Sequence, residues 1–140
     1  MAVVILVLSV AIFAIAIAHT RRAREARRAA AATVNLEVDR WGVKRSLADG
    51  RYEEVAWDEL QEVRLVTLPK GPWDERLRFV LDGGGERGCI VPFDVAEGSD
   101  LLASLSALSG FDHRRLADAL ENIRTGNLVL WTSADRRTST

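Results

Sequence analysis

The first 18 residues are the part of the sequence that most constrains how this chain folds. Residues 2–18 form an apolar run, AVVILVLSVAIFAIAIA, in which Ser9 is the one polar residue and no charge, glycine or proline occurs. As a helix, a run of this length extends for roughly 25 Å, close to the shortest length that spans the hydrocarbon core of a bilayer. A helix also satisfies its own backbone hydrogen bonds inside a membrane. The run therefore predicts a transmembrane helix over residues 1–20.

Two other interpretations of the apolar run stay open. A cleaved signal peptide normally has positive charge before its apolar stretch, and here only the amino terminus precedes it, although Ala14, Ala16 and Ala18 resemble a cleavage site. A buried core helix that is apolar on every face has to be enclosed completely, and a chain of 140 residues has little material for that. The membrane span is the interpretation that we carry forward.

A basic segment directly follows the apolar run and predicts its orientation. Its five arginines are Arg21, Arg22, Arg24, Arg27 and Arg28. Positive flanks stay in the cytoplasm, so we expect a single-pass protein of the cell membrane with its C-terminal domain in the cytoplasm. Residues 21–33 are expected to form a helical stalk whose arginines contact the anionic headgroups of the lipid bilayer. We expect no nucleic-acid partner, because the rest of the chain has 14 basic against 19 acidic side chains.

Beyond residue 33 the alanine-rich pattern gives way to an alternation of apolar and polar residues, which is typical of strands. Turn signals occur at Arg40-Trp41-Gly42, at Asp49-Gly50 and at the three glycines from residue 83, and two prolines make a loop between residues 68 and 74. Helical spacing of leucines follows, with Asp112 as the expected N-cap of the second helix. The pattern predicts strands over residues 34–38, 43–47, 52–55, 61–68, 76–82 and 87–91, helices over 101–108 and 112–123, and a last strand over 128–131.

The whole predicted fold is of the α+β class: an N-terminal transmembrane helix followed by a small antiparallel β-roll with C-terminal helices. The folded domain is expected to cover residues 34–132, and the polar residues 133–140 to form a disordered tail. One domain of this size is what a chain of this length accommodates.

Two segments of the domain carry a resemblance to a known family. Val38-Asp39-x-x-Gly42-Val43, then a turn, then Val55-x-Trp57-Asp58-Glu59-Leu60-x-x-Val63, resembles the front half of bacterial PH-like domains, over roughly residues 34–68. The resemblance implies a PH-like β-roll with Trp57 packed under a corner, and agrees with a membrane tether. The chain is also similar to uncharacterised short single-pass membrane proteins of GC-rich, actinobacteria-like bacteria. Two helices and a further strand at the C-terminus depart from the single capping helix of a PH fold.

The sequence has no residue pattern that is typical of an enzyme. His19 and His113 lack the spacing of metal ligands, and Cys89 is a single cysteine in an apolar run, where a buried small side chain is the simpler interpretation. Glu53-Glu54 and Asp58-Glu59 are expected at strand ends and turns, where charged side chains are solvated. We therefore predict no catalytic activity, cofactor, metal site or small-molecule substrate.

Two tryptophans are the candidate binding residues. Trp73 lies on the proline-rich loop and Trp41 lies at a hairpin turn, so each could provide a large aromatic anchor for a protein partner. The alternative for both is that the side chain folds back over the sheet. The sequence thus predicts a membrane-anchored, non-enzymatic interaction or scaffolding module at the inner membrane face. The alternative is a domain that senses anionic lipids.

Overall fold

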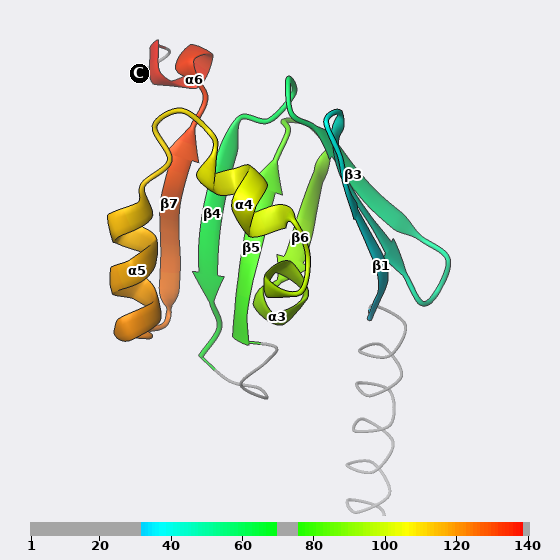
Figure 1. Ribbon diagram of the computed structural model, residues 1–140, viewed down its shortest axis with the longest axis horizontal. Helices are drawn as coiled ribbons and strands as arrows, with labels where there is room; N and C mark the ends of the chain where they lie inside the picture. The colour runs from blue at the N-terminus through cyan, green and yellow to red at the C-terminus, as the bar shows by residue number, and fades with distance from the viewer. Residues whose placement is uncertain (1–31, 70–75, 139–140) are drawn as a thin grey trace, which may run out of the picture.

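A computed structural model of the chain describes residues 32–69 and 76–138, which form two antiparallel sheets and four short helices (Figure 1). The strands are β1 (Thr33–Val38), β2 (Gly42–Leu47), β3 (Tyr52–Ala56), β4 (Glu62–Thr67), β5 (Leu77–Asp82), β6 (Gly88–Pro92) and β7 (Gly126–Thr132). The helices are α3 (Phe93–Glu97), α4 (Leu101–Ser106), α5 (His113–Glu121) and α6 (Ala134–Thr138).

The first sheet is a meander of three strands in the order β1-β2-β3. Val43 of β2 is opposite Val38 of β1 and Val55 of β3, so the apolar positions of all three strands share the inner face. The turn between β2 and β3 uses Gly50 at φ 87°, a backbone conformation that glycine adopts without the clash of a side chain.

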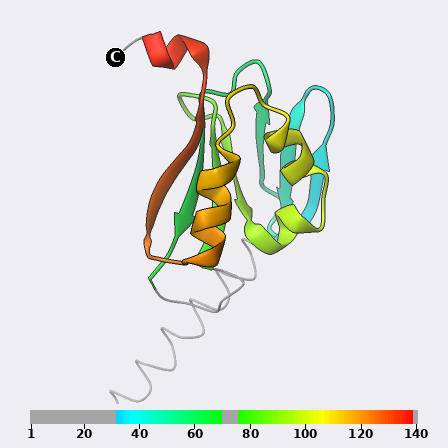
Figure 2. The ribbon, with the colours of Figure 1, turned by 60° about the vertical axis from the view of Figure 1, so that its left-hand side comes forward.

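The second sheet has four strands in the order β6-β5-β4-β7. Strands β4, β5 and β6 follow one another in the chain, whereas β7 returns after the helices to pair antiparallel with the free side of β4. Figures 1 and 2 show α3, α4 and α5 together on one side of this sheet. Among the described residues, no helix covers the other side of the sheet in these views.

Both sheets contribute to one hydrophobic core. The side of the four-stranded sheet that faces the helices buries Phe79, whose ring lies 5.7 Å from that of Phe93. Leu101 and Leu105 of α4 are also fully buried, and Val43 and Val55 bring the inner face of the three-stranded sheet into the same cluster. Strand alternation and the leucine spacing of α4 therefore place their apolar residues against one another.

The predicted fold class is wrong as a whole. The described residues form mainly antiparallel β-structure in two separate sheets, and their helices have only five to nine residues, so the chain here is neither a single β-roll nor an evenly mixed α+β fold. The roll does not close because β3 and β6 lie side by side without forming a ladder. A side chain bridges the two strands instead, as described below.

The transmembrane part of the predicted fold also needs correction. Over residues 32–69 and 76–138, no helix combines the length and the apolar character that crossing a membrane requires. The predicted span over residues 1–20 and nearly all of the predicted stalk over residues 21–33 lie outside the described residues. Thr33 already belongs to β1 rather than to a helical stalk.

Two short helices were not predicted from the sequence. Helix α3 directly follows β6, where five residues between Pro92 and Gly98 are too few to reveal a helical period. Helix α6 occurs in the tail that was predicted to be disordered. It is linked to the end of the four-stranded sheet because Arg136 pairs with Glu62 at 3.0 Å and with Asp82 at 3.3 Å.

Candidate partner-binding face

The hairpin between β1 and β2 presents the most exposed large apolar side chain of the described residues. Trp41 is 70% exposed, and the Arg40 guanidinium lies 4.9 Å from the centre of its ring. The Asp39 carboxylate fixes the turn by accepting hydrogen bonds from the backbone N–H groups of Trp41 at 2.8 Å and Gly42 at 3.1 Å. Asp39 explains why the chain turns here, since aspartate bonds readily to the backbone of the next two or three residues.

Trp57 holds the same hairpin from the other side. Its backbone N–H donates to the carbonyl of Trp41 at 3.0 Å, and its indole N–H donates to the carbonyl of Asp39 at 2.7 Å. Gly42 allows this close approach, because a Cβ there would lie 2.2 Å from the carbonyl oxygen of Val55. The backbone under Trp41 is therefore fixed while its side chain stays in solvent.

The outer face of the three-stranded sheet continues from this hairpin. Lys44 is opposite Glu37 on β1 and Glu54 on β3, and Tyr52 is opposite Ser46 two residues further along the sheet. The Lys44 ammonium group lies 4.7 Å from the centre of the Tyr52 ring, which is itself 59% exposed. Trp41 and Lys44 line a hollow of about 260 Å³ that also includes Glu54 and Arg87.

A larger hollow of about 590 Å³ lies where β3 meets β6. Tyr52 and Glu54 line it from β3, and Ile90, 39% exposed, lines it from β6. Val80 and Arg64 extend it across the second sheet, because they are neighbours of Ile90 in the same row of side chains. We call the surface formed by both hollows the open face; it comprises Trp41, Lys44, Tyr52, Glu54, Arg64, Val80, Glu86, Arg87 and Ile90.

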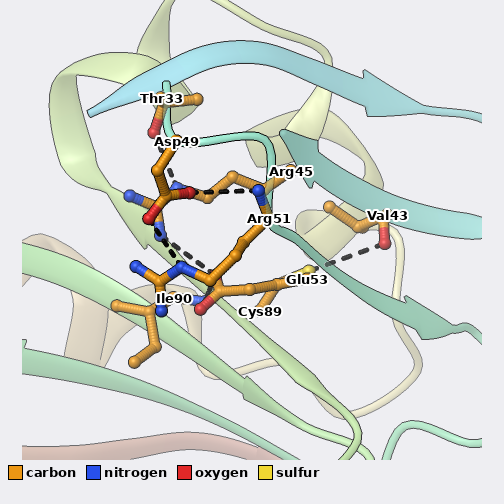
Figure 3. Close-up of polar contacts among 8 residues, drawn as sticks. All are labelled: Thr33, Val43, Arg45, Asp49, Arg51, Glu53, Cys89 and Ile90. Atoms are coloured by element: carbon orange, nitrogen blue, oxygen red, sulfur yellow. Dashed lines mark hydrogen bonds and ion pairs between the residues drawn. The ribbon is translucent and has the colours of Figure 1, made fainter. Parts of the chain in front are cut away.

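A polar junction beneath the open face joins the two sheets (Figure 3). Arg45 points inward and is only 8% exposed, and its guanidinium pairs with the Glu53 carboxylate at 3.0 Å and donates to the Thr33 hydroxyl at 2.6 Å. The same Glu53 oxygen accepts the backbone N–H of Ile90 at 3.1 Å. One carboxylate thus takes the place of a strand ladder between β3 and β6.

Cys89 lies in this junction and does not have the properties of a nucleophile. Its thiol donates to the carbonyl of Val43 at 3.6 Å, and burial raises the pKa of Cys89 to about 12, with a smaller contribution from the Glu53 charge. A thiol with that pKa is protonated at neutral pH, and the thiolate is the reactive form. Among the described residues, no group of three or more histidine, cysteine or carboxylate side chains is arranged to hold a metal ion.

The charges of the open face are mixed in sign. Arg64 pairs with Glu62, and Arg87 pairs with Glu59 at 3.1 Å, so both guanidinium groups already have carboxylate partners. Glu54 and Glu86 lie at the rim of the larger hollow, and neither forms an ion pair within the part of the chain that the structure describes. The face therefore offers the charges of Glu54, Glu86 and Lys44 around the apolar side chains of Tyr52, Val80 and Ile90.

The residues singled out from the sequence lie in different surroundings in the structure. Trp41 is exposed at the hairpin, as a binding residue requires, whereas Trp73 and the five arginines of the basic segment lie outside the described residues. Trp57 is half-buried and packs against the core in a turn after β3. Tyr52 and Ile90 were missed. The sequence signal that could have found them is strand alternation, since each occupies an outward-facing position that alternates along its strand with residues that face inward.

Comparison with protein-family models, curated proteins and solved structures finds no match to this chain. The resemblance to PH-like domains over residues 34–68 therefore stays a prediction.

Proposed function

We propose that this domain is a non-enzymatic interaction module that binds a protein partner on the open face. The observation that carries the proposal is Trp41, a large aromatic side chain that is 70% exposed on a backbone held by Asp39 and Trp57. Tryptophan is enriched among the residues that dominate binding energy, and a fixed backbone lowers the entropy lost on binding.

Two further exposed apolar residues support a protein partner. Tyr52 and Ile90 line the larger hollow together with Val80 and Arg64. Protein interfaces typically combine such an apolar, aromatic centre with a charged rim, which Glu54 and Glu86 provide here. The partner that fits carries apolar side chains next to lysine or arginine.

The alternative of an anionic-lipid sensor is less well supported by this surface. Anionic headgroups require a cluster of unpaired basic side chains, and Arg64 and Arg87 are each paired with a glutamate. Lys44 lies between Glu37 and Glu54 in the strand register. We therefore favour a protein over a lipid on the open face.

Site-specific photo-crosslinking tests the proposal in the full chain. A benzophenone amino acid would replace Tyr52 in one variant and Leu120, which is exposed on α5, in the control variant. We expect covalent adducts with a discrete protein from position 52 and none from position 120. Lipid adducts at position 52, or equal protein adducts from both positions, would contradict the proposal.

A second variant tests the role of Trp41 as an anchor. With the photo-reactive residue at position 52, Trp41→Ala should reduce the protein adduct at least tenfold, because loss of a binding anchor typically costs about 2 kcal/mol or more. Glu121→Ala on α5 serves as a control that should leave the adduct unchanged. An adduct that persists in Trp41→Ala would remove Trp41 from the proposed interface.

A further inference from the structure

The four sheet edges of this domain differ in how they are covered. Carbonyls at the edge of β7 accept hydrogen bonds, Leu130 from the backbone of Asp112 at 2.9 Å and Val129 from the Arg115 guanidinium at 3.1 Å. The edges of β3 and β6 lie against each other and share the hydrogen bond between Glu53 and Ile90. Edges that are left bare are templates for pairing with another strand, so proteins normally cover them.

The edge of β1 is the exception in the described part of the chain. Strand β2 is its only extensive neighbour, and no hydrogen bond from another described residue reaches its outer side. The backbone N–H of Asp39 donates to the carbonyl of Gly42. Backbone groups of every second residue in a strand point the same way, so the N–H and C=O groups of Glu37 and Asn35 also point toward β2. The N–H and C=O groups of Leu36 and Val38 consequently point to the bare edge.

The sequence of this strand is nearly symmetric about Leu36. Residues 34–38 read Val-Asn-Leu-Glu-Val, so an antiparallel pair of two copies centred on Leu36 sets Val34 of one copy against Val38 of the other. Val34 is 64% exposed in the single chain and has an apolar neighbour in this arrangement. Asn35 then lies opposite Glu37, where its amide can donate to the carboxylate, as it does within one chain at 3.4 Å.

We infer that β1 pairs with β1 of a second copy of this chain, joining two three-stranded sheets into one sheet of six strands. Pairing centred on Glu37 would set glutamate against glutamate, which is unfavourable, so the charges select the register centred on Leu36. An antiparallel pair has its two-fold axis perpendicular to the sheet. Both copies of Trp41 therefore lie on the same side, where a bivalent partner would gain avidity.

Sedimentation equilibrium of the full chain, in density-matched detergent, tests this pairing. We expect the unmodified chain to form a dimer, and Asn35→Glu to weaken it at least tenfold by placing two glutamates opposite each other. Asn35→Lys should instead strengthen the dimer, because each lysine then lies opposite Glu37 of the other copy. Asn127→Glu, the same change on exposed β7, should have no effect. A monomeric unmodified chain, or a dimer that Asn35→Glu leaves unchanged, would overturn the inference.

Disulfide trapping tests the register independently of stability. Positions 35 and 37 of opposite copies would form a non-hydrogen-bonded pair with Cα atoms about 4.5 Å apart, within the range of a disulfide. A mixture of Asn35→Cys chains and Glu37→Cys chains should oxidise to linked dimers, whereas either variant alone should stay largely unlinked. Cys89 is buried and common to both samples. Equal linking in the single-variant samples would exclude this register, and no linking in the mixture would exclude the pairing.

Discussion

The two sheets of this domain differ in how much of their surface the rest of the chain covers. Helices pack on one side of the four-stranded sheet, its β7 edge accepts hydrogen bonds from the start of α5, and Phe79, Leu65 and Leu81 are fully buried. The three-stranded sheet has a bare edge at β1 and carries the exposed side chains of Trp41 and Tyr52. We infer that the four-stranded sheet supplies most of the stability and that the three-stranded sheet is available for binding.

Removing a ring from the four-stranded sheet should have the largest effect. Phe79→Ala is expected to lower the free energy of unfolding by about 3–5 kcal/mol, because Phe79 is fully buried and stacks on Phe93. Urea denaturation followed by circular dichroism measures the change. A loss below about 1 kcal/mol would mean that this sheet does not dominate stability.

A substitution in the polar junction between the sheets should give the next largest loss of unfolding free energy. Glu53→Ala removes the carboxylate that holds Arg45 and the N–H of Ile90, leaving a buried guanidinium without this partner. We expect a loss of about 2–3 kcal/mol, less than for a fully buried ion pair because the Glu53 side chain is partly exposed. Glu54→Ala, the same change one residue along on the outer face, should cost less than about 0.5 kcal/mol. Equal losses in both variants would remove Glu53 from the junction.

Alkaline pH should destabilise the junction through Cys89. Its pKa is about 12 when folded against an ordinary value of 9.0, so below about pH 8 the thiol is protonated in both states and contributes no pH dependence. Between pH 9 and 12 only the unfolded chain loses the proton, and stability should fall by about 1.4 kcal/mol per pH unit. Denaturation of the unmodified chain and of Cys89→Ala across this range isolates the contribution. Identical slopes would show that the thiol titrates normally.

The covered edge of β7 should show a smaller effect. The Asp112 carboxylate caps α5 by accepting the backbone N–H of Arg115 at 2.9 Å, at the point where the helix meets β7. Asp112→Ala should cost about 1 kcal/mol, the usual value of a lost N-cap. Asp118→Ala, in the same helix but outside the cap, is the matched control and should leave the unfolding midpoint unchanged.

Features of the fold that depend on neighbouring residues could be predicted from the sequence. Each predicted strand corresponds to a strand of the structure, because alternation is a local signal, and Asp112 was identified as a helix cap from its position alone. The pairing of β4 with β7 could not be predicted, since nothing local in Leu128 or Leu130 specifies a strand so distant in the chain. The split into two sheets was missed for a similar reason.

The burial of the junction residue Arg45 could not be predicted from the sequence either. Alternation along β2 puts positions 43, 45 and 47 on one face, and a charge at the middle position argues against burial of that face. Arg45 is nevertheless buried, because its guanidinium donates hydrogen bonds to Glu53 on β3 and Thr33 on β1. Of the candidate site, Trp41 was recognised as a large aromatic at a turn, whereas the hollow between Tyr52 and Ile90 depends on how the sheets meet.

The bare edge of β1 should respond least to substitution, and this provides the clearest contrast with the covered sheet. Val34 is 64% exposed and lies at an irregularity of the β1–β2 register, so Val34→Lys buries no charge and removes little packing. We expect the unfolding free energy of the monomer, measured at low micromolar concentration, to change by less than about 0.5 kcal/mol. Val63→Lys, on a fully buried position of β4, is the matched change and should prevent stable folding. If Val34→Lys instead destabilises the monomer by more than about 1 kcal/mol, the edge of β1 is part of the core, and the division between a stabilising sheet and a binding sheet fails.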